Sequence, residues 1–395
     1  MKGDHVVFIP DRQQAEKALE EIGADRAGIQ WMAPKAVFRV VKLKSVPCPA
    51  ANIIKQEMLS KGGEAAVKRD TVSGQGDTDV LLMGTLRHYR LLVDKLKMQP
   101  FGLERIAAEL TGMLNSLEEP GVKVLKLLGG KSLTIGERTL IMGILNLTPD
   151  SFSDGGRYPD TAAAVARALQ MVEEGADIVD IGGMSTRPGH TIVPVEEELR
   201  RVVPVVEKLA GLLPVPISVD TYRAEVARAC LEAGADIIND ISSLAFDSRL
   251  AGVIAEYRAP VIIMHNRPGG VYQNLIDDIT ADLRTALTRA TEAGISEDRI
   301  IIDPGIGFGK NAQENLVVLK RLREFRSLGK PILLGTSRKR FIGAALDLPV
   351  GERLEGSLAT VAIGIMNGAD IIRVHDVWQS KRVAGMTDAV VRCDG

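Results

Sequence analysis

Short apolar runs alternate with amphipathic stretches of helical periodicity from residue 131 onward. Each run is rich in Val and Ile and is followed by a helical segment. The runs occupy residues 140–146, 176–183, 215–220, 235–240, 259–265, 299–305, 331–337 and 369–375. Eight strand–helix units within about 250 residues are what a TIM (β/α)8 barrel requires. A doubly wound parallel sheet is the alternative, but it seldom has eight such even repeats, so the pattern favours the barrel.

The residues before 131 show a different, less regular pattern of strands and helices. They predict strand 36–46, helix 50–60, strands 64–68 and 80–86, and further helices to residue 114. Residues 121–130 begin at the Gly of a Pro-Gly pair and end in a Gly-Gly pair, so they are predicted to be a linker, followed by a short hairpin around Gly136. We therefore predict an α/β chain with a small α/β domain of unassigned role at residues 1–120 and a barrel at residues 131–395.

The composition excludes several classes of function. Lys and Arg number 49 against 51 Asp and Glu, so the basic excess typical of nucleic-acid or membrane-surface binding is missing. No apolar stretch approaches the roughly 20 residues of a membrane span. The three Cys residues are scattered, which argues against a disulfide framework or a zinc site. We expect a cytoplasmic protein that acts on small molecules.

Nearly every predicted strand delivers a polar or charged side chain at its C-terminal end. In a barrel these ends converge on one face, where active sites lie. The residues at these ends are Asn146, Asp180, Asp220, Asn239 with Asp240, Met264 with His265, Asp303, Ser337 to Lys339, and Arg373 with His375. A single Asp at such a point is explained by helix capping. Capping does not require Lys339, Arg373 and His375, so the convergence predicts an active site.

These residue types suggest a ligand with two parts. Carboxylates and amides suit a flat, nitrogen-rich heterocycle, whereas Lys, Arg and His supply positive charge for an anion. No His, Asp and Glu cluster has the spacing of a transition-metal site. Asn146 is instead suited to a Mg²⁺ ion that arrives with a phosphate group, because Mg²⁺ prefers oxygen ligands and keeps its waters.

The stretch DPGIGFGK at residues 303–310 superficially resembles a phosphate-binding loop. It fails the Walker pattern, because Pro304 stands where the first Gly belongs and Asn311 replaces Ser or Thr. Its glycines are expected to allow tight turns beside a ligand. Phe308 either forms a wall of the pocket or packs within its own loop, and the sequence leaves both open.

Several motifs in order closely resemble the dihydropteroate synthases of bacterial folate biosynthesis. They are MGILNLTPDSFSDGG (142–156), DIGGMSTRPG (180–189), SVDT (218–221), ND (239–240), DPGIGFGK (303–310), GTSRK (335–339) and RVHDV (373–377). The resemblance covers about residues 131–392. It implies an enzyme that joins 4-aminobenzoate to 6-hydroxymethyl-7,8-dihydropterin diphosphate, releasing pyrophosphate. It also implies a Mg²⁺ cofactor, inhibition by sulfonamides and a homodimer.

The resemblance assigns roles to individual positions. Those expected to act on the reaction itself are Asn146, which contacts the Mg²⁺-bound diphosphate, Lys339, Arg373 and His375. Those expected to bind the pterin are Asp220, Asn239, Asp303 and Lys339, with Asp180 nearby, Met264 against the ring and Phe308 along the pocket. Those expected to bind the diphosphate are Arg373 and His375. Those expected to shape the aminobenzoate pocket are Thr186, Arg187 and Pro188, with Phe152 on another loop.

Two positions depart from the family pattern. Arg340 stands where the family usually has Ser, whose hydroxyl and backbone help to bind the aminobenzoate carboxylate. We predict that Arg340 binds that carboxylate instead; the alternative is that it points to solvent. Met184 replaces a common Glu.

Two other functions compete with this interpretation. A methyltetrahydrofolate-dependent methyltransferase that serves a corrinoid protein would share the Asp and Asn contacts to a pterin, without needing a diphosphate site. A non-catalytic pterin-binding paralogue would not need to keep the leaving-group residues either. The presence of Asn146, Lys339, Arg373 and His375 favours the synthase over both.

Overall fold

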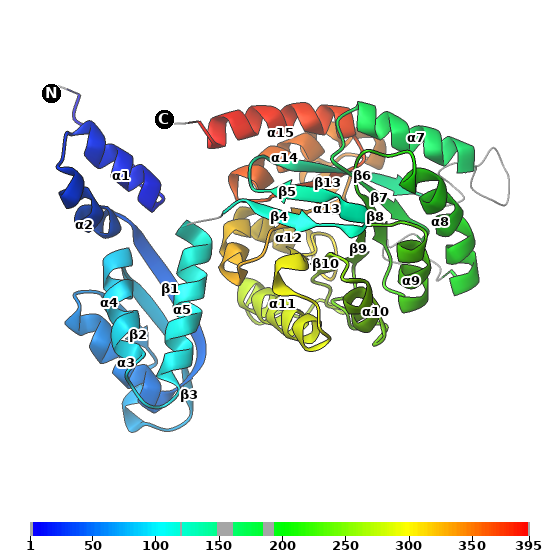
Figure 1. The fold of residues 1–395 in the computed structure, drawn as a ribbon. Helices are drawn as coiled ribbons and strands as arrows, with labels where there is room; N and C mark the ends of the chain where they lie inside the picture. The colour runs from blue at the N-terminus through cyan, green and yellow to red at the C-terminus, as the bar shows by residue number, and fades with distance from the viewer. Residues whose placement is uncertain (1–2, 119–120, 148–160, 185–192, 394–395) are drawn as a thin grey trace. The chain divides into compact units, whose positions relative to one another are not determined.

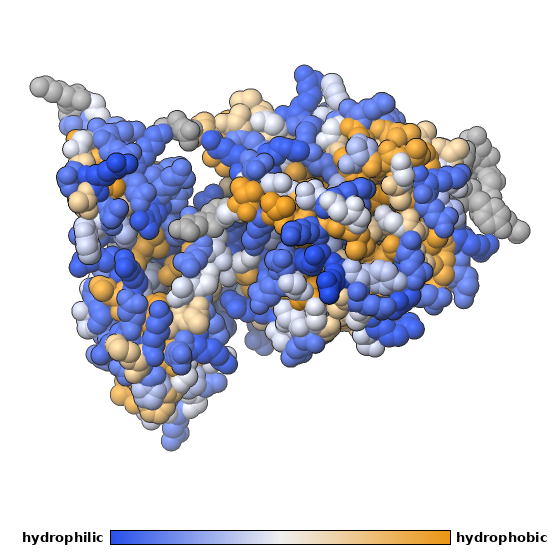
Figure 2. Space-filling model, viewed as in Figure 1, coloured by the Kyte–Doolittle hydropathy of each residue, from blue (hydrophilic) through white to orange (hydrophobic). Residues whose placement is uncertain are grey.

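The computed structural model describes residues 3–118, 121–147, 161–184 and 193–393. The chain divides into two compact units, residues 1–120 and 121–395 (Figure 1). The surface visible in Figure 2 is mainly hydrophilic, with hydrophobic patches between the charged side chains. None of the described helices is long and apolar enough to cross a membrane.

Eight parallel strands form a barrel in the second unit. They are β6 (Leu140–Asn146), β7 (Ile178–Gly182), β8 (Ile217–Asp220), β9 (Ile237–Asp240), β10 (Val261–Met264), β11 (Ile300–Asp303), β12 (Leu333–Leu334) and β13 (Ile371–Val374). They pair in the order β11-β10-β9-β8-β7-β6-β13-β12. A bridge between Ile302 and Ile332 joins β11 to the segment leading into β12 and closes the sheet. The predicted TIM barrel is confirmed, and an open doubly wound sheet is ruled out.

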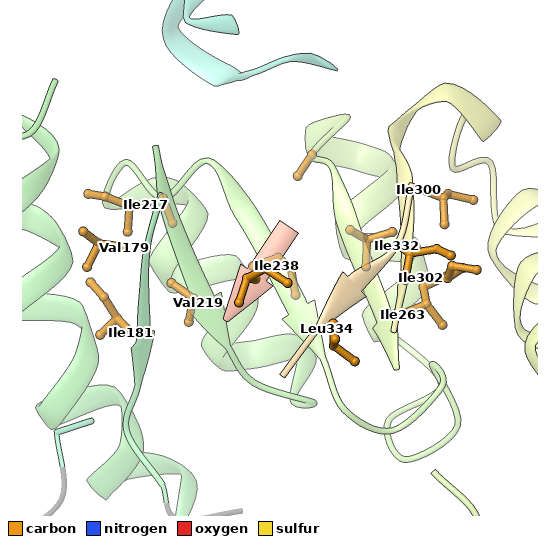
Figure 3. Close-up of a cluster of buried hydrophobic side chains, with 14 of the residues drawn as sticks. Val179, Ile181, Ile217, Val219, Ile238, Ile263, Ile300, Ile302, Ile332 and Leu334 are labelled. Carbon is orange, nitrogen blue, oxygen red and sulfur yellow. The ribbon is translucent and has the colours of Figure 1, made fainter. Parts of the chain in front are cut away.

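Helices surround the strands in Figure 1. They are α7 (Thr161–Glu173), α8 (Val195–Ala210), α9 (Ala224–Glu232), α10 (Leu250–Tyr257), α11 (Leu275–Glu292), α12 (Ala312–Lys320), α13 (Arg340–Leu346), α14 (Leu354–Met366) and α15 (Val377–Val391). The strand residues that face them are buried Ile, Val and Leu (Figure 3). Full burial of such a side chain contributes roughly 1.5–3 kcal/mol, so this layer between strands and helices is a major source of stability.

Strand alternation decides which side chains point into the barrel. Ile217 and Val219 of β8 pack outward against the helices, so Ser218 and Asp220 point inward. The same parity applies to the other strands. The inward residues at or near their C-terminal ends are Asn146, Asp180, Asp220, Asn239, Met264, Asp303 and Arg373. The barrel interior is therefore lined mainly by polar side chains at the C-terminal ends of the strands.

A hairpin closes the barrel at the N-terminal ends of its strands, where the sequence had predicted a linker. Residues 121–130 were predicted to be a linker, but β4 (Lys123–Lys126) pairs antiparallel with β5 (Ser132–Ile135). Leu125 and Leu133 pack on the lower inward residues of the barrel strands. The Gly pair that suggested a linker forms the turn of the hairpin. Gly129 and Gly130 have φ of 69° and 82°, which glycine adopts readily.

The first unit is a small α/β structure. Its elements are α1 (Arg12–Glu21), α2 (Arg26–Ala36), β1 (Phe38–Pro47), α3 (Cys48–Ser60), β2 (Glu64–Val67), β3 (Asp77–Thr85), α4 (Leu86–Leu96) and α5 (Leu103–Glu118). The antiparallel sheet has the order β1-β3-β2 and shares a core with α3, α4 and α5. Helices α1 and α2 were not predicted, although Asp11 and Asp25 cap their first turns.

Candidate active site

Three of the predicted site residues share one rung of the barrel. The register pairs Asn146 with Gly182, Gly182 with Asp220, and Asp220 with Asn239. A Cβ atom at Gly182 would lie 3.6 Å from Asn146 Oδ1 and 3.7 Å from Asp220 Cβ. The glycine therefore leaves a gap between the amide and the carboxylate. Asn146 is half-buried.

A guanidinium joins two buried carboxylates beside this rung. Arg373 donates from Nε to Asp180 Oδ2 at 2.6 Å and from Nη2 to Asp220 Oδ2 at 2.8 Å. Asn239 Nδ2 also donates to Asp180 Oδ2, at 3.1 Å. The second oxygens, Asp180 Oδ1 and Asp220 Oδ1, are buried and have no hydrogen-bond partner among the residues that the structure describes. An unpaired buried acceptor costs about 1–3 kcal/mol, so these two oxygens are sites where a donor ligand would be stabilised.

The ionisable groups of this face are strongly perturbed. Burial raises the pKa of Asp220 to about 7, with Arg373 opposing the rise and Asp180 adding to it. Burial lowers the pKa of Lys339 to about 8, against the attraction of Asp303. Burial also raises the pKa of Asp303, and Lys339 opposes that shift. Clustered perturbed groups of both signs are typical of a functional site.

Lys339 lies near Asp303, at the end of β11, and near the loop that contains Phe308. It is the N-cap residue of α13, and its ammonium donates to the carbonyl of Ile306. The same ammonium lies 4.6 Å from the centre of the Phe308 ring, within range of a cation–π contact. Phe308 also packs on a small apolar cluster that contains Met184 and Met264. The polar rim thus has an apolar wall along one side, to which Phe308 contributes.

His375 follows β13 directly and is held by Ser337, one of the residues predicted at the strand ends. Its Nδ1 lies 3.0 Å from Ser337 Oγ, and its backbone N–H donates to the same oxygen at 3.2 Å. Arg340 is exposed at the first position of α13. The predicted residues Thr186, Arg187, Pro188 and Phe152 lie outside the residues that the structure describes.

A buried ion pair beside the site was missed. Glu198 of α8 is fully buried and accepts from Thr221 Oγ1 and Arg223 Nη1, each at 2.9 Å. Arg223 also donates to the carbonyl of Val193 at 2.7 Å. This network fixes the backbone directly after Asp220. No sequence signal separates Glu198 from its neighbours, because it lies in a run of three Glu at the start of a helix.

The C-terminal face of the barrel therefore offers two carboxylates with unpaired acceptor oxygens in the described structure, a lysine, an arginine and a histidine, with a small apolar cluster beside them. The described residues contain no group of three or more His, Cys, Asp or Glu arranged to hold a metal ion. The arrangement can bind a flat donor-rich ring and an anion side by side.

Comparison with known proteins agrees with this chemistry. Residues 142–375 match a family model described as pterin binding enzyme. The chain is 52% identical over 266 residues to the dihydropteroate synthase of Clostridium beijerinckii, which covers 67% of this chain and 99% of that protein. It is 42% identical over 385 residues to a probable bifunctional folylpolyglutamate synthase/dihydropteroate synthase of Halobacterium salinarum, covering 95% of this chain and 46% of that protein.

A solved structure resembles the barrel unit closely. The dihydropteroate synthase of Xanthomonas albilineans, determined with 4-aminobenzoic acid, superposes with a TM-score of 0.65 and 43% sequence identity, covering 68% of this chain and 98% of that one. The matched family model, the relatives and the barrel geometry agree. This chain belongs to the dihydropteroate synthase family of pterin-binding enzymes.

Proposed function

We propose that the chain condenses 4-aminobenzoate with 6-hydroxymethyl-7,8-dihydropterin diphosphate, giving 7,8-dihydropteroate and pyrophosphate. The observation that carries this proposal is the juxtaposition of Asp180 and Asp220, whose free oxygens suit ring N–H groups, with the cationic Arg373. A pterin binder alone has no need of cations beside the ring, whereas a diphosphate leaving group has.

The pterin ring is placed by complementary hydrogen bonding. Asp220 Oδ1 accepts from the ring N–H and exocyclic amino groups, and Asp180 with Asn239 completes the polar edge. Asp303 and Lys339 present an acceptor and a donor toward the same pocket. The apolar cluster around Met264, with Phe308, covers the ring surface. Aromatic and thioether groups suit a flat polarisable ring.

The diphosphate is held by the positive end of the site. Arg373 and His375 lie on and directly after β13, and both are proposed to bind diphosphate oxygens. Asn146 is the residue proposed to hold Mg²⁺, because its amide oxygen faces the gap left by Gly182. A single protein oxygen fits an ion that keeps waters and takes further oxygens from the diphosphate. When bound, Mg²⁺ neutralises charge on the departing diphosphate.

Bond formation needs no activated nucleophile. The lone pair of the aminobenzoate amine forms the C–N bond at the exocyclic methylene of the pterin as the C–O bond breaks. The electron pair of that bond leaves with the diphosphate, and the amine then loses a proton to solvent. Arg373 and His375 stabilise the growing negative charge. Sulfonamides, which resemble 4-aminobenzoate in shape, are expected to compete with it.

A coupled pyrophosphate assay tests the proposed function. We expect release only when the pterin diphosphate, Mg²⁺ and 4-aminobenzoate are all present. Methyl transfer from methyltetrahydrofolate to cobalamin without pyrophosphate would instead identify a corrinoid methyltransferase. Tight pterin binding with neither reaction would identify a non-catalytic paralogue.

Arg340 is proposed to bind the aminobenzoate carboxylate through its guanidinium or its backbone N–H at the start of α13. A partly exposed charge-assisted contact contributes about 1–2 kcal/mol, or roughly ten- to thirtyfold in affinity. Arg340→Ala should therefore raise the KM for aminobenzoate by that factor with little change for the pterin substrate. Arg340→Ser should recover part of the loss. An aminobenzoate KM within twofold of the parent would show that this side chain points to solvent.

The barrel unit is proposed to contain all of the chemistry. A shortened chain that begins at residue 121 should keep kcat and both KM values within about threefold, since every predicted site residue lies after it. A chain that begins at residue 131 should unfold at a lower temperature, because it lacks β4 and exposes the apolar end of the barrel. Loss of activity in the folded, longer version would assign a catalytic contribution to the first unit.

A homodimer through α14 and α15 is also proposed. Trp378, Met386 and Val390 lie on one stripe of α15 and are exposed by 51%, 67% and 57%, and Met366 of α14 is exposed by 55%. Helices α14 and α15 pack together. An exposed apolar stripe of this kind is typical of an interface. Light scattering should give twice the chain mass for the parent, and Met386→Glu should shift it toward the monomer.

A further inference from the structure

The last residue of the DPGIGFGK stretch is directed into the protein. Lys310 Nζ lies 2.9 Å from His265 Nδ1 and donates to the carbonyl oxygens of Gly305 at 2.9 Å and Phe308 at 3.1 Å. An ammonium group has three N–H donors, so each one has an acceptor within the protein. None is left for a phosphate, which is the structural reason that this stretch does not act as a phosphate-binding loop.

His265 connects Lys310 to the middle of helix α11. Its ring is fully buried after β10, and Nε2 lies 3.0 Å from Asp282 Oδ2 of α11. Because a carboxylate only accepts, Nε2 carries the proton and Nδ1 is free to accept from Lys310. Arg267 also donates to Asp282 Oδ2, at 2.8 Å. Burial and the nearby Lys310 lower the pKa of His265 to about 4, so the ring is neutral at physiological pH.

Two glycines bring the loops after β10 and β11 into backbone contact. A Cβ atom at Gly305 would lie 1.9 Å from the carbonyl oxygen of His265, and one at Gly309 would lie 2.1 Å from that of Arg267. Both glycines have positive φ, at 71° and 57°. Any other residue would push the loops apart. The segment 304–309 therefore lies directly on the loop that contains His265.

This glycine segment positions the pterin side of the proposed site. Asp303 Oδ1 accepts from the backbone N–H of Gly305 at 2.7 Å. Ile306 provides the carbonyl that accepts from Lys339, and the Phe308 ring lies beside the same ammonium. The acceptor, the donor and the aromatic wall of the pocket thus all depend on the path of one short segment, which Lys310 fastens at two carbonyls.

We propose that Lys310, hydrogen-bonded to His265 and linked through it to Asp282, is a positioning residue that sets the geometry of the pterin site. It contacts no substrate and acts through the Gly305 and Phe308 carbonyls. The inference rests on the proposed function, because it assigns residues 303–308 to the pterin side. It predicts a defect confined to pterin binding, whereas a general packing defect would affect both substrates.

The test is calorimetry of pterin diphosphate binding to the full-length protein with Mg²⁺, together with steady-state kinetics. Lys310→Met should weaken pterin binding about tenfold or more, the loss expected when its hydrogen bonds to the two carbonyls and to His265 are removed, while the aminobenzoate KM stays within twofold. Lys320→Met is the matched control, because Lys320 is exposed at the other end of α12 and should leave both values unchanged.

A second pair of variants decides the matter if Lys310→Met does not fold. His265→Asn keeps an acceptor near the Nδ1 position, whereas His265→Leu has none, so the Asn variant should bind pterin diphosphate more tightly than the Leu variant. Equal affinity of these two, or parent-like pterin affinity in folded Lys310→Met, would overturn the proposal. A parent protein that binds no pterin diphosphate would overturn the proposed function itself, which keeps the two failures distinguishable.

Discussion

Replacing Arg373 with Gln should lower kcat by about a hundred- to a thousandfold, the range measured when a donor that stabilises developing negative charge is removed. The guanidinium is proposed to hold the leaving diphosphate, and it is also the cation that joins Asp180 and Asp220. Without it the two carboxylates repel each other at close range, so the pKa of Asp220 should rise further and pterin affinity should fall as well.

Single-turnover measurements separate these two consequences. At saturating pterin diphosphate the single-turnover rate of Arg373→Gln should stay low, because the chemical step itself is slowed. The loss of pterin affinity should lower the rate further only at subsaturating pterin diphosphate. Arg373→Lys keeps the charge but cannot reach both carboxylates in the forked geometry, so it should lie between Gln and the parent. Arg284→Gln, at an exposed position of α11, is the control and should behave like the parent. A kcat within threefold of the parent in folded Arg373→Gln would exclude the guanidinium from the chemical step.

The barrel could be predicted because its signal is repeated. Each strand has outward Ile and Val at alternating positions, as Ile217 and Val219 show in β8, and the intervening residue at the strand end must then point inward. The sequence located Asp220 and Asp303 at strand ends, and the alternation observed in the structure directs both side chains into the barrel. The binding roles assigned to them stay predictions.

Other features depend on contacts that no local pattern encodes. Strand β4 was mistaken for a linker because Gly129 and Gly130 are equally typical of a linker and of a hairpin turn, and β5 pairs with β4 and not across Gly136 as predicted. Lys310 entered the prediction only as the last residue of the DPGIGFGK motif and was given no role, since its partner His265 lies 45 residues away in sequence. The partners of a buried cation are set by how two loops cross, and that becomes visible only in three dimensions.

Replacing Asp220 with Asn should weaken binding of pterin diphosphate by about a hundredfold or more. The carboxylate is proposed to accept two N–H donors of the ring, and charge-assisted hydrogen bonds of this kind contribute roughly 1.5–3 kcal/mol each. The Asn amide has one oxygen, which keeps the hydrogen bond from Arg373, so its NH2 group faces the two ring donors and both ring contacts become repulsions. Calorimetry at pH 8 gives the affinity directly. Unchanged affinity would refute the assignment of this residue to the pterin.

The pH dependence of the parent protein provides an independent check on the same residue. Burial raises the pKa of Asp220 to about 7, and only the ionised form accepts both ring donors. Pterin affinity should therefore increase as pH rises through about 7 in the parent, and this step should be missing in Asp220→Asn.

The stability of the variant should move in the opposite direction to its affinity. A folded-state pKa of about 7, above the unfolded value near 4, means that the stabilising contribution of Asp220 is complete below about pH 4 and is lost as pH rises through 7. Above that pH the buried ionised carboxylate is a cost that Asn does not impose. Asn also keeps one oxygen that can accept from Arg373. The Tm of Asp220→Asn at pH 8 should therefore equal or exceed that of the parent, and a large drop in Tm would mean that the affinity loss reports damage to the barrel and not loss of a ligand contact.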